Sequence, residues 1–137
     1  MTHLYNAMPP FTHRDPGVIG AARDEKNCRV ELICDGVHIH PFVVRATLAM
    51  FGADRVIFIS DSLRGTGLTD GKYMLGGQEV TVEGPRATLA DGTLAGSVTS
   101  LMGCIRTVVL QMGIPLETAV QCTTVNTCQG NRDLWHL

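Results

Sequence analysis

The sequence predicts an α/β fold, and the prediction rests on composition and on the order of its segments. A chain of 137 residues has room for one ordinary domain with a core of its own. It is 45% hydrophobic and 18% charged, a balance that excludes an intrinsically disordered chain. Two strand-like segments, 28–34 and 55–60, flank a helix-like segment at 41–51. A strand, a helix and a second strand in this order, joined by short connections, indicate one βαβ unit with parallel strands.

Each segment of this unit has its own local signal. The first strand, 28–34, alternates its side chains between two faces. Pro41 suits the first position of a helix and Gly52 suits its end, so the helix is predicted between them. The second strand, 55–60, is apolar almost throughout, as in parallel strands that are covered on both faces.

The segments outside this unit are of three kinds. Residues 2–5 predict a short strand, and the prolines that follow it predict a loop. Residues 73–82 predict a β-hairpin with Gly76-Gly77 as a two-residue turn. Apolar residues between 98 and 112 recur at i, i+3, i+4 and i+7 and predict an amphipathic helix, and a shorter helix is predicted over 115–123.

Charge, aromatic content and cysteine usage exclude several classes of protein. The net charge of −2 and the 5% aromatic content give neither the basic surface nor the stacking residues of a nucleic-acid-binding protein. No apolar stretch approaches the roughly 20 residues that cross a bilayer, and no signal peptide is visible. Cys28 and Cys34, on one face of the first predicted strand, are predicted to be buried thiols, and five cysteines without a CxxC pair indicate a reducing, cytoplasmic protein.

Acidic and histidine side chains follow both predicted parallel strands. Asp35, His38 and His40 come after the first strand, and Asp61 comes after the second. In α/β proteins the chemistry lies at the carboxyl ends of the strands, so these residues are candidates for a site. The alternative is that Asp35 only starts a turn and that Asp61 only caps a helix, and spacing alone leaves both interpretations open.

Five blocks of the sequence resemble one enzyme family. They are Thr2-His-Leu-Tyr-Asn-Ala-Met-Pro9 with His13-Arg-Asp-Pro-Gly17, then Asp35-Gly-Val-His38, Ile59-Ser-Asp61, Thr66-Gly67 and Asp91-Gly-Thr-Leu-Ala-Gly-Ser97. In this order and spacing they resemble the N-acetylglucosamine-6-phosphate deacetylases of the amidohydrolase superfamily. The resemblance runs from about Thr2 to Asn126.

The resemblance implies part of a metal-dependent (β/α)₈ barrel, namely its last strands and helices, with a β-hairpin insertion. It also implies hydrolysis of the acetamide of N-acetylglucosamine 6-phosphate to glucosamine 6-phosphate and acetate. The cofactor would be a divalent metal, zinc first, with iron or another metal as alternatives. The substrate would be a phosphosugar, the enzyme a homodimer, and neither nucleic acid nor membrane a partner.

The site residues are carried over from the matching motifs. His3 matches a metal ligand, Asn6 and Ala7 match sugar-phosphate contacts, and Arg14 matches a phosphate-binding arginine that in relatives reaches across a dimer interface. Two further stretches match substrate contacts: Asp35, Gly36, Val37 and His38, and then Leu94, Ala95 and Gly96. His40 has no counterpart, and a helix-capping or solvent-exposed role is expected for it. Ser97 and Gly96 have the alternative role of capping the next helix.

Asp61 matches the catalytic aspartate at the end of the last barrel strand. The reaction needs a carboxylate that takes a proton from the attacking water and returns it to the departing amine. The family commonly has Thr-Asp-Ala at this point where this chain has Ser60-Asp61-Ser62, a change that keeps the carboxylate.

A complete barrel takes about 250 residues, so residues 1–126 are expected to be its C-terminal part and to be inactive and loosely packed alone. After Asn126 the family commonly continues Pro-Ala-Lys-Ala-Ile-Gly, where this chain differs. Codons allowed for residues 127–137, read one nucleotide later, encode Pro-Ala-Lys-Ala-Ile-Gly. We therefore expect this tail to be out-of-frame translation, with a natural divergent tail as the alternative. Two other functional interpretations stay open: a non-catalytic truncated remnant, and an amidohydrolase for a different amide.

Overall fold

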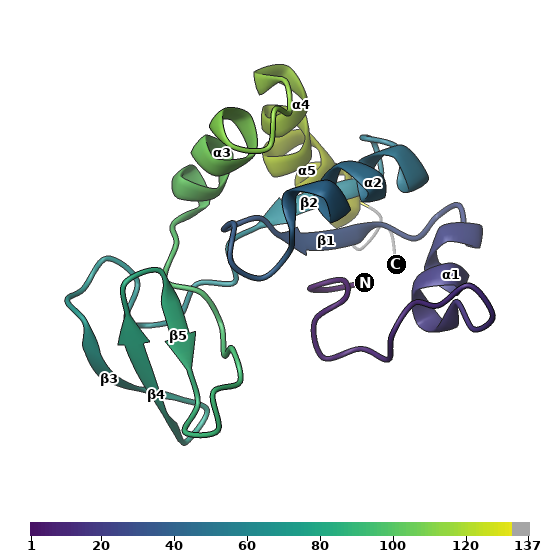
Figure 1. Cartoon of the computed structure of the whole chain (residues 1–137). Coiled ribbons are helices and arrows are strands. Elements are labelled where there is room, and N and C mark those ends of the chain that lie inside the picture. Colours follow the sequence, from purple (N-terminus) through teal and green to yellow (C-terminus); the bar gives the residue numbers. More distant parts are fainter. Residues whose placement is uncertain (133–137) are drawn as a thin grey trace.

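The computed structural model describes the backbone of residues 1–132. Its elements are α1 (Gly17–Asp24), β1 (Val30–Ile33), α2 (Pro41–Phe51), β2 (Val56–Ile59), β3 (Gly71–Leu75), β4 (Gln78–Glu83), β5 (Arg86–Thr88), α3 (Leu101–Leu110), α4 (Leu116–Val120), the π-helix η1 (Gln121–Val125) and α5 (Asn126–Arg132). Figure 1 shows two parts, an α/β layer around β1 and β2 and a small antiparallel sheet beside it.

The predicted βαβ unit is confirmed. Strands β1 and β2 pair in parallel, with Val30 opposite Val56 and Ile33 opposite Ile59, and α2 forms the connection between them. Helix α2 begins as expected at Pro41, and the Nδ1 atom of His40 accepts a hydrogen bond of 3.2 Å from the backbone N–H of Phe42. His40 is therefore the helix cap, one of the two roles expected for it.

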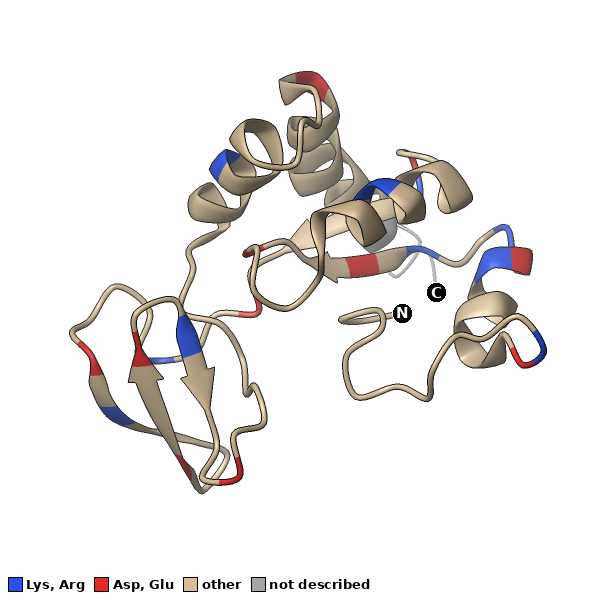
Figure 2. Ribbon diagram, in the orientation of Figure 1, with Lys and Arg blue, Asp and Glu red and all other residues tan. Residues whose placement is uncertain are grey.

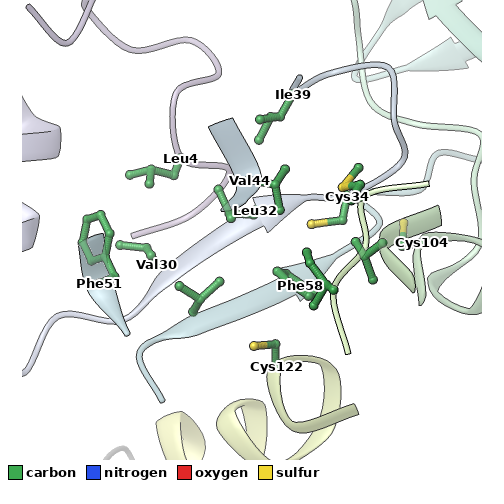
Figure 3. Packing of buried hydrophobic residues seen from close by; sticks show 14 of the residues in the cluster. Leu4, Val30, Leu32, Cys34, Ile39, Val44, Phe51, Phe58, Cys104 and Cys122 are labelled. Atoms are coloured by element: carbon green, nitrogen blue, oxygen red, sulfur yellow. The ribbon is translucent and has the colours of Figure 1, made fainter. Parts of the chain in front are cut away.

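The main hydrophobic core (Figure 3) includes alternate residues of the two parallel strands, so it lies against one face of the pair. Val30, Leu32, Val56 and Phe58 are each at most 2% exposed, and side chains from α2 and α3 pack on them. Ile57, on the opposite face of β2, is 8% exposed, so both faces of this strand are largely covered, which explains why it is apolar without alternation. Cys34 is buried in this core as predicted, together with Cys104 and Cys122, whereas Cys28 is only half-buried at its edge.

The predicted hairpin is present as β3 and β4, with Leu75 opposite Gln78 across the turn. Gly76 and Gly77 have φ of 57° and 86°, the positive angles that favour glycine in such a two-residue turn. A third strand, β5, extends the hairpin into a three-stranded meander that the sequence pattern does not predict. The meander has a small core of its own, formed by Leu63, Val80, Val82 and Ala87.

The start of the chain differs from the prediction. Residues 2–5 form a turn and not a strand. The turn still joins the sheet edge, because the backbone N–H of Glu31 donates to Met1 O at 2.9 Å and that of Leu4 donates to Glu31 O at 2.7 Å. Helix α1 follows the proline-rich loop and was not predicted, since its first residue is a glycine and its N-cap is Pro16.

The helix predicted over 98–112 is shorter than its apolar pattern. Helix α3 begins at Leu101 because the Oγ atom of Ser100 accepts a hydrogen bond from Gly103 N at 3.1 Å. Ser97 does not cap this helix, so that alternative is wrong. Met102, on the predicted apolar face, is 65% exposed, and the helix packs through Cys104 and Val108.

Helices α4, η1 and α5 follow one another without a break, so the helical segment continues past residue 126, where the tail was expected to begin. Asn126 is 1% exposed, and its side-chain N–H group donates to the carbonyl oxygens of Ala53 and Val56, each at 2.6 Å. It thus fixes this helical segment to the start of β2. The expected tail, 127–137, begins within α5, and its residues 133–137 lie outside the described part of the chain.

Charged residues are spread over most of the elements, and α3 and α4 carry few of them (Figure 2). Among the described helices, none has both the length and the apolar character that a bilayer crossing requires.

Candidate functional site

One cavity of about 370 Å³ gathers most of the predicted site residues. It lies where the first turn of the chain and the carboxyl ends of β1 and β2 meet. Its lining side chains come from four separate stretches of sequence: His3, Asn6, Ala7, Ile33, His38, Asp61, Thr93, Leu94 and Gly96. Seven of the twelve predicted site residues therefore lie around one space, although up to 93 positions separate them (Gly96 from His3).

The imidazole of His3 is oriented by its own turn. Its Nδ1 atom lies 3.0 Å from the carbonyl oxygen of Asn6. Because a carbonyl oxygen only accepts, Nδ1 carries the proton, and Nε2 keeps its lone pair. A metal-ligating histidine is commonly prepared in this way. The side chain of Asn6 donates to the carbonyl oxygens of His3 and Leu4 and so holds the turn closed.

The backbone is strained at this cavity. Among the described residues, four that are not glycine have positive φ: His3, Tyr5, Ala7 and Asp61. His3, Ala7 and Asp61 line the cavity, and Tyr5 lies between His3 and Ala7 in the first turn. Such conformations cost about 1–3 kcal/mol each and concentrate at functional sites. These backbone angles therefore indicate a functional site without any reference to the chemistry of the side chains.

The turn is fixed to α2 by one hydrogen bond. The hydroxyl of Tyr5 lies 2.6 Å from Thr47 Oγ1, and Thr47 itself donates to Val43 O at 2.8 Å. Since the proton of Thr47 is used for Val43, Tyr5 is the donor. The bond spans 42 positions and holds a strained segment against a fully buried threonine.

Replacing Tyr5 with phenylalanine removes only this bond. We expect the free energy of unfolding to fall by about 1 kcal/mol, the usual net value of such a hydrogen bond. The measurement is the midpoint of urea unfolding of the purified chain at constant slope. Tyr73→Phe is the matched control, because the Tyr73 hydroxyl donates to Thr69 O on an exposed loop. Equal losses of unfolding free energy in Tyr5→Phe and Tyr73→Phe would contradict the stabilising role of the Tyr5–Thr47 hydrogen bond.

Asp35 and His38 form a buried pair beside the cavity. Asp35 Oδ2 lies 2.7 Å from His38 Nδ1, and the two side chains are 0% and 6% exposed. Asp35 Oδ1 accepts the backbone N–H groups of Val37 at 2.9 Å and of His38 at 3.0 Å. Burial on its own raises the pKa of Asp35, but the hydrogen bonds from His38 and Val37 outweigh it, and the pKa lies below its ordinary value of 3.8.

This lowered pKa predicts a stability that depends on pH. A carboxyl that binds protons more weakly in the folded chain stabilises it fully above the unfolded pKa, and the contribution is lost as the pH falls through the folded pKa. We expect the stability difference between the wild type and Asp35→Asn to be constant above about pH 5 and to shrink on acidification below it. Urea unfolding from pH 3 to pH 7 measures this. A difference that grows toward low pH would contradict it.

Asp61 reaches the cavity on a sharply bent backbone. Its φ is 51°, and its carbonyl oxygen accepts the N–H of Ser97 at 2.8 Å. The neighbouring Gly96 has a φ of 67°, a backbone conformation that favours glycine. No helix begins directly after Asp61, since the next is α3, and the alternative role as a helix cap is therefore wrong.

Five predicted site residues do not line the cavity. Arg14 is exposed on the loop before α1. Asp35, Gly36 and Val37 form the turn beneath His38, and Ala95 packs against the core of the meander. The cavity adds Ile33, from the buried strand, and Thr93, which directly precedes the predicted stretch from Leu94 to Gly96.

The donor set fits a metal in part. His3 presents an unprotonated Nε2, the form that binds a divalent cation. The described residues contain no group of three histidine, cysteine or acidic side chains that would hold a metal ion. His3 is thus suited to be one ligand of a metal site.

Comparison with known proteins identifies the family. The chain is 54% identical over 98 residues to the N-acetylglucosamine-6-phosphate deacetylase of Bacillus subtilis, a match to 72% of this chain and 25% of that protein. It is 40% identical over 128 residues to the same enzyme of Lysinibacillus sphaericus, which covers 93% of this chain and 33% of the relative. The chain belongs to the N-acetylglucosamine-6-phosphate deacetylase family.

Other members of the family extend the match. A putative N-acetylgalactosamine-6-phosphate deacetylase of Escherichia coli strain K12 is 34% identical over 124 residues, which are 90% of this chain and 74% of that protein. The crystal structure of a Mycobacterium smegmatis deacetylase mutant in complex with N-acetyl-D-glucosamine-6-phosphate superposes with a TM-score of 0.89 at 34% identity, over 94% of this chain and 35% of that one. No protein-family profile matches. The chain spans about a quarter of the length of the first relative and about a third of the second.

Proposed function

We propose that residues 1–126 form the last strands and helices of an amidohydrolase barrel that deacetylates N-acetylglucosamine 6-phosphate, with the β3–β5 meander inserted after β2. The observation that carries the proposal is the convergence of His3, Asn6, His38 and Asp61 on one cavity. The family membership supports the substrate class. We also propose that residues 127–137 are out-of-frame translation, which the coding DNA tests directly.

In this proposal the chemical step belongs to Asp61. Amidohydrolases are metal-dependent, and His3 would hold the metal, which when bound polarises the acetyl carbonyl and lowers the pKa of a water. The carboxylate of Asp61 takes the proton from the attacking water. It then delivers the same proton to the nitrogen of the leaving amine, which departs poorly unless it is protonated.

The remaining residues hold the sugar phosphate. Asn6, Ala7 and Leu94 line the cavity, where the side chain of Asn6 and the backbone of the other two would contact the sugar. Arg14, which is exposed and outside the cavity, would bind the phosphate in the cavity of a second subunit. Its guanidinium has the planar, forked shape that pairs with two phosphate oxygens.

The proposed role of Arg14 predicts a loss that depends on the phosphate. In an active dimer we expect Arg14→Ala to weaken binding of N-acetylglucosamine 6-phosphate about tenfold or more, since a charge-assisted contact is about twice as strong as a neutral one. Binding of N-acetylglucosamine itself stays within about twofold. Arg23→Ala, an exposed arginine on α1, is the matched control. Equal losses for both sugars would show that Arg14 only shapes its loop.

A hybrid enzyme tests the function as a whole. It is the Lysinibacillus sphaericus relative in which the 128-residue aligned segment is replaced by the matching segment of this chain. The expected result is release of acetate from N-acetylglucosamine 6-phosphate, abolished by His3→Ala. A folded hybrid with its metal bound but no acetate release would overturn the proposal in favour of a non-catalytic remnant. Release from another amide only would favour an amidohydrolase of different specificity.

The epimeric sugar phosphate is the second candidate substrate. The relative that this chain covers over 74% of its length is named for N-acetylgalactosamine 6-phosphate. Comparing kcat/KM of the hybrid for the two epimers decides between them.

A further inference from the structure

The buried carboxylate of Asp35, beside the cavity, makes one hydrogen bond beyond the two that close its own turn. Oδ1 of Asp35 alone closes the turn, because it accepts both Val37 N and His38 N. Oδ2 has a different partner, the ring of His38, at 2.7 Å. The two oxygens thus do two separate tasks, one on the backbone and one on a side chain that lines the cavity.

We infer that Asp35 is a positioning residue, which fixes the ring of His38 with Nδ1 protonated and Nε2 presented to the substrate. This inference rests on the proposed function for the identity of the substrate, and it assigns Asp35 no contact with the sugar. It differs from the expectation that Asp35 binds substrate directly.

The geometry determines which ring nitrogen carries the proton. A carboxylate offers only acceptors, so Nδ1 of His38 must be the donor to Oδ2. Within the described part of the chain, Nε2 has no hydrogen-bond partner, and it is not among the buried polar atoms that lack one. Nε2 is therefore open to the cavity, where its lone pair accepts a sugar hydroxyl, or, after protonation, its N–H meets an anionic oxygen.

The surroundings leave Asp35 paired with His38 alone. The other titratable side chains near it are the thiols of Cys34 and Cys104. Burial raises the pKa of both, that of Cys104 to about 11, so both are neutral at pH 7. Since the carboxylate and the imidazole side chains are almost fully buried, water competes little for their hydrogen bond.

The substitution Asp35→Asn separates the two tasks of the carboxylate. The amide oxygen of asparagine still accepts the turn N–H groups, as Asp91 Oδ1 does from Thr93 N in a turn without a histidine. Its NH₂ group then occupies the place of Oδ2 and faces Nδ1 with a donor. The ring must accept there, so its proton moves to Nε2. Asp91→Asn, on an exposed loop next to a cavity residue, is the matched control.

The experiment measures the imidazole nitrogens of the full chain by long-range ¹H–¹⁵N correlation, with His38→Gln for assignment. We expect the Nδ1–H tautomer for neutral His38 in the wild type and in Asp91→Asn, and the Nε2–H tautomer in Asp35→Asn. An Nε2–H tautomer in the wild type would overturn the inference, and this measurement needs no variant to fold. An unchanged tautomer in folded Asp35→Asn would also overturn it.

Kinetics of the hybrid enzyme link the tautomer to the substrate. We expect Asp35→Asn to raise KM for the sugar phosphate about tenfold, roughly the value of one hydrogen bond to a charged group, and to change kcat less than about threefold. A fall in kcat at constant KM would contradict the positioning role. A wild-type hybrid without acetate release, together with the Nδ1–H tautomer in the chain, would refute the proposed function and not the positioning of His38.

Discussion

Asp61→Asn lowers kcat of the hybrid enzyme by about 10²–10⁴-fold, the usual contribution of a general acid–base group. Asparagine keeps the size of the side chain and can still hydrogen-bond the acetamide, so KM is expected to change little. Its amide cannot take up the proton of the attacking water, and the amine then leaves unprotonated. Metal content should stay near that of the wild type if the carboxylate is mainly a base. The measurement combines kcat, bound metal and melting temperature for one variant.

Asp54→Asn is the matched control for this prediction. Asp54 is an exposed carboxylate that precedes β2, whereas Asp61 follows it, so the two lie at opposite ends of one strand. The control variant should keep its kcat, because Asp54 does not line the cavity of Asp61. An Asp61→Asn variant with near-normal kcat and a lowered melting temperature would refute the catalytic role.

Phe58→Ala should be the most destabilising single change in the core. Phe58 is 2% exposed on β2 and belongs to the main hydrophobic core of the chain (Figure 3). Truncating a buried phenylalanine to alanine removes its burial and leaves a cavity, at a cost of about 3–5 kcal/mol. The total stability of a domain is about 5–15 kcal/mol, so this loss is a large fraction of it.

Phe42→Ala separates the effect of burial from that of residue type. Phe42 lies on α2 and is 64% exposed, and its truncation should change the free energy of unfolding by about 0.5 kcal/mol or less. Urea unfolding of both variants, at the same slope as the wild type, gives the comparison. Similar losses for Phe58 and Phe42 would show that the chain lacks the packed core described for β1 and β2.

Local patterns predicted the elements whose signals are short in range. The parallel strands, α2 with its proline start, and the glycine turn of the hairpin each depend on residues within a few positions, and all three are confirmed. The first turn failed as a strand prediction because the strain at His3 and Tyr5 is imposed from outside. Tyr5 is fixed by Thr47, and Leu4 by the core and by Glu31, none of which the local pattern reveals.

The candidate site divides in the same way. The sequence motifs by themselves determined the family, which the comparisons confirm, and they named His3, Asn6, His38 and Asp61 as candidates for one site. The motifs assigned Asp35 and His38 the same role, because positions within one motif carry no information on which side chain faces a cavity. Only the tertiary structure decided that Asp35 is turned inward onto the His38 ring, that Ile33 and Thr93 line the cavity, and that Ala95 does not. The reason is physical: side-chain direction follows from backbone angles and from packing between distant segments, and both are fixed only when the chain has folded.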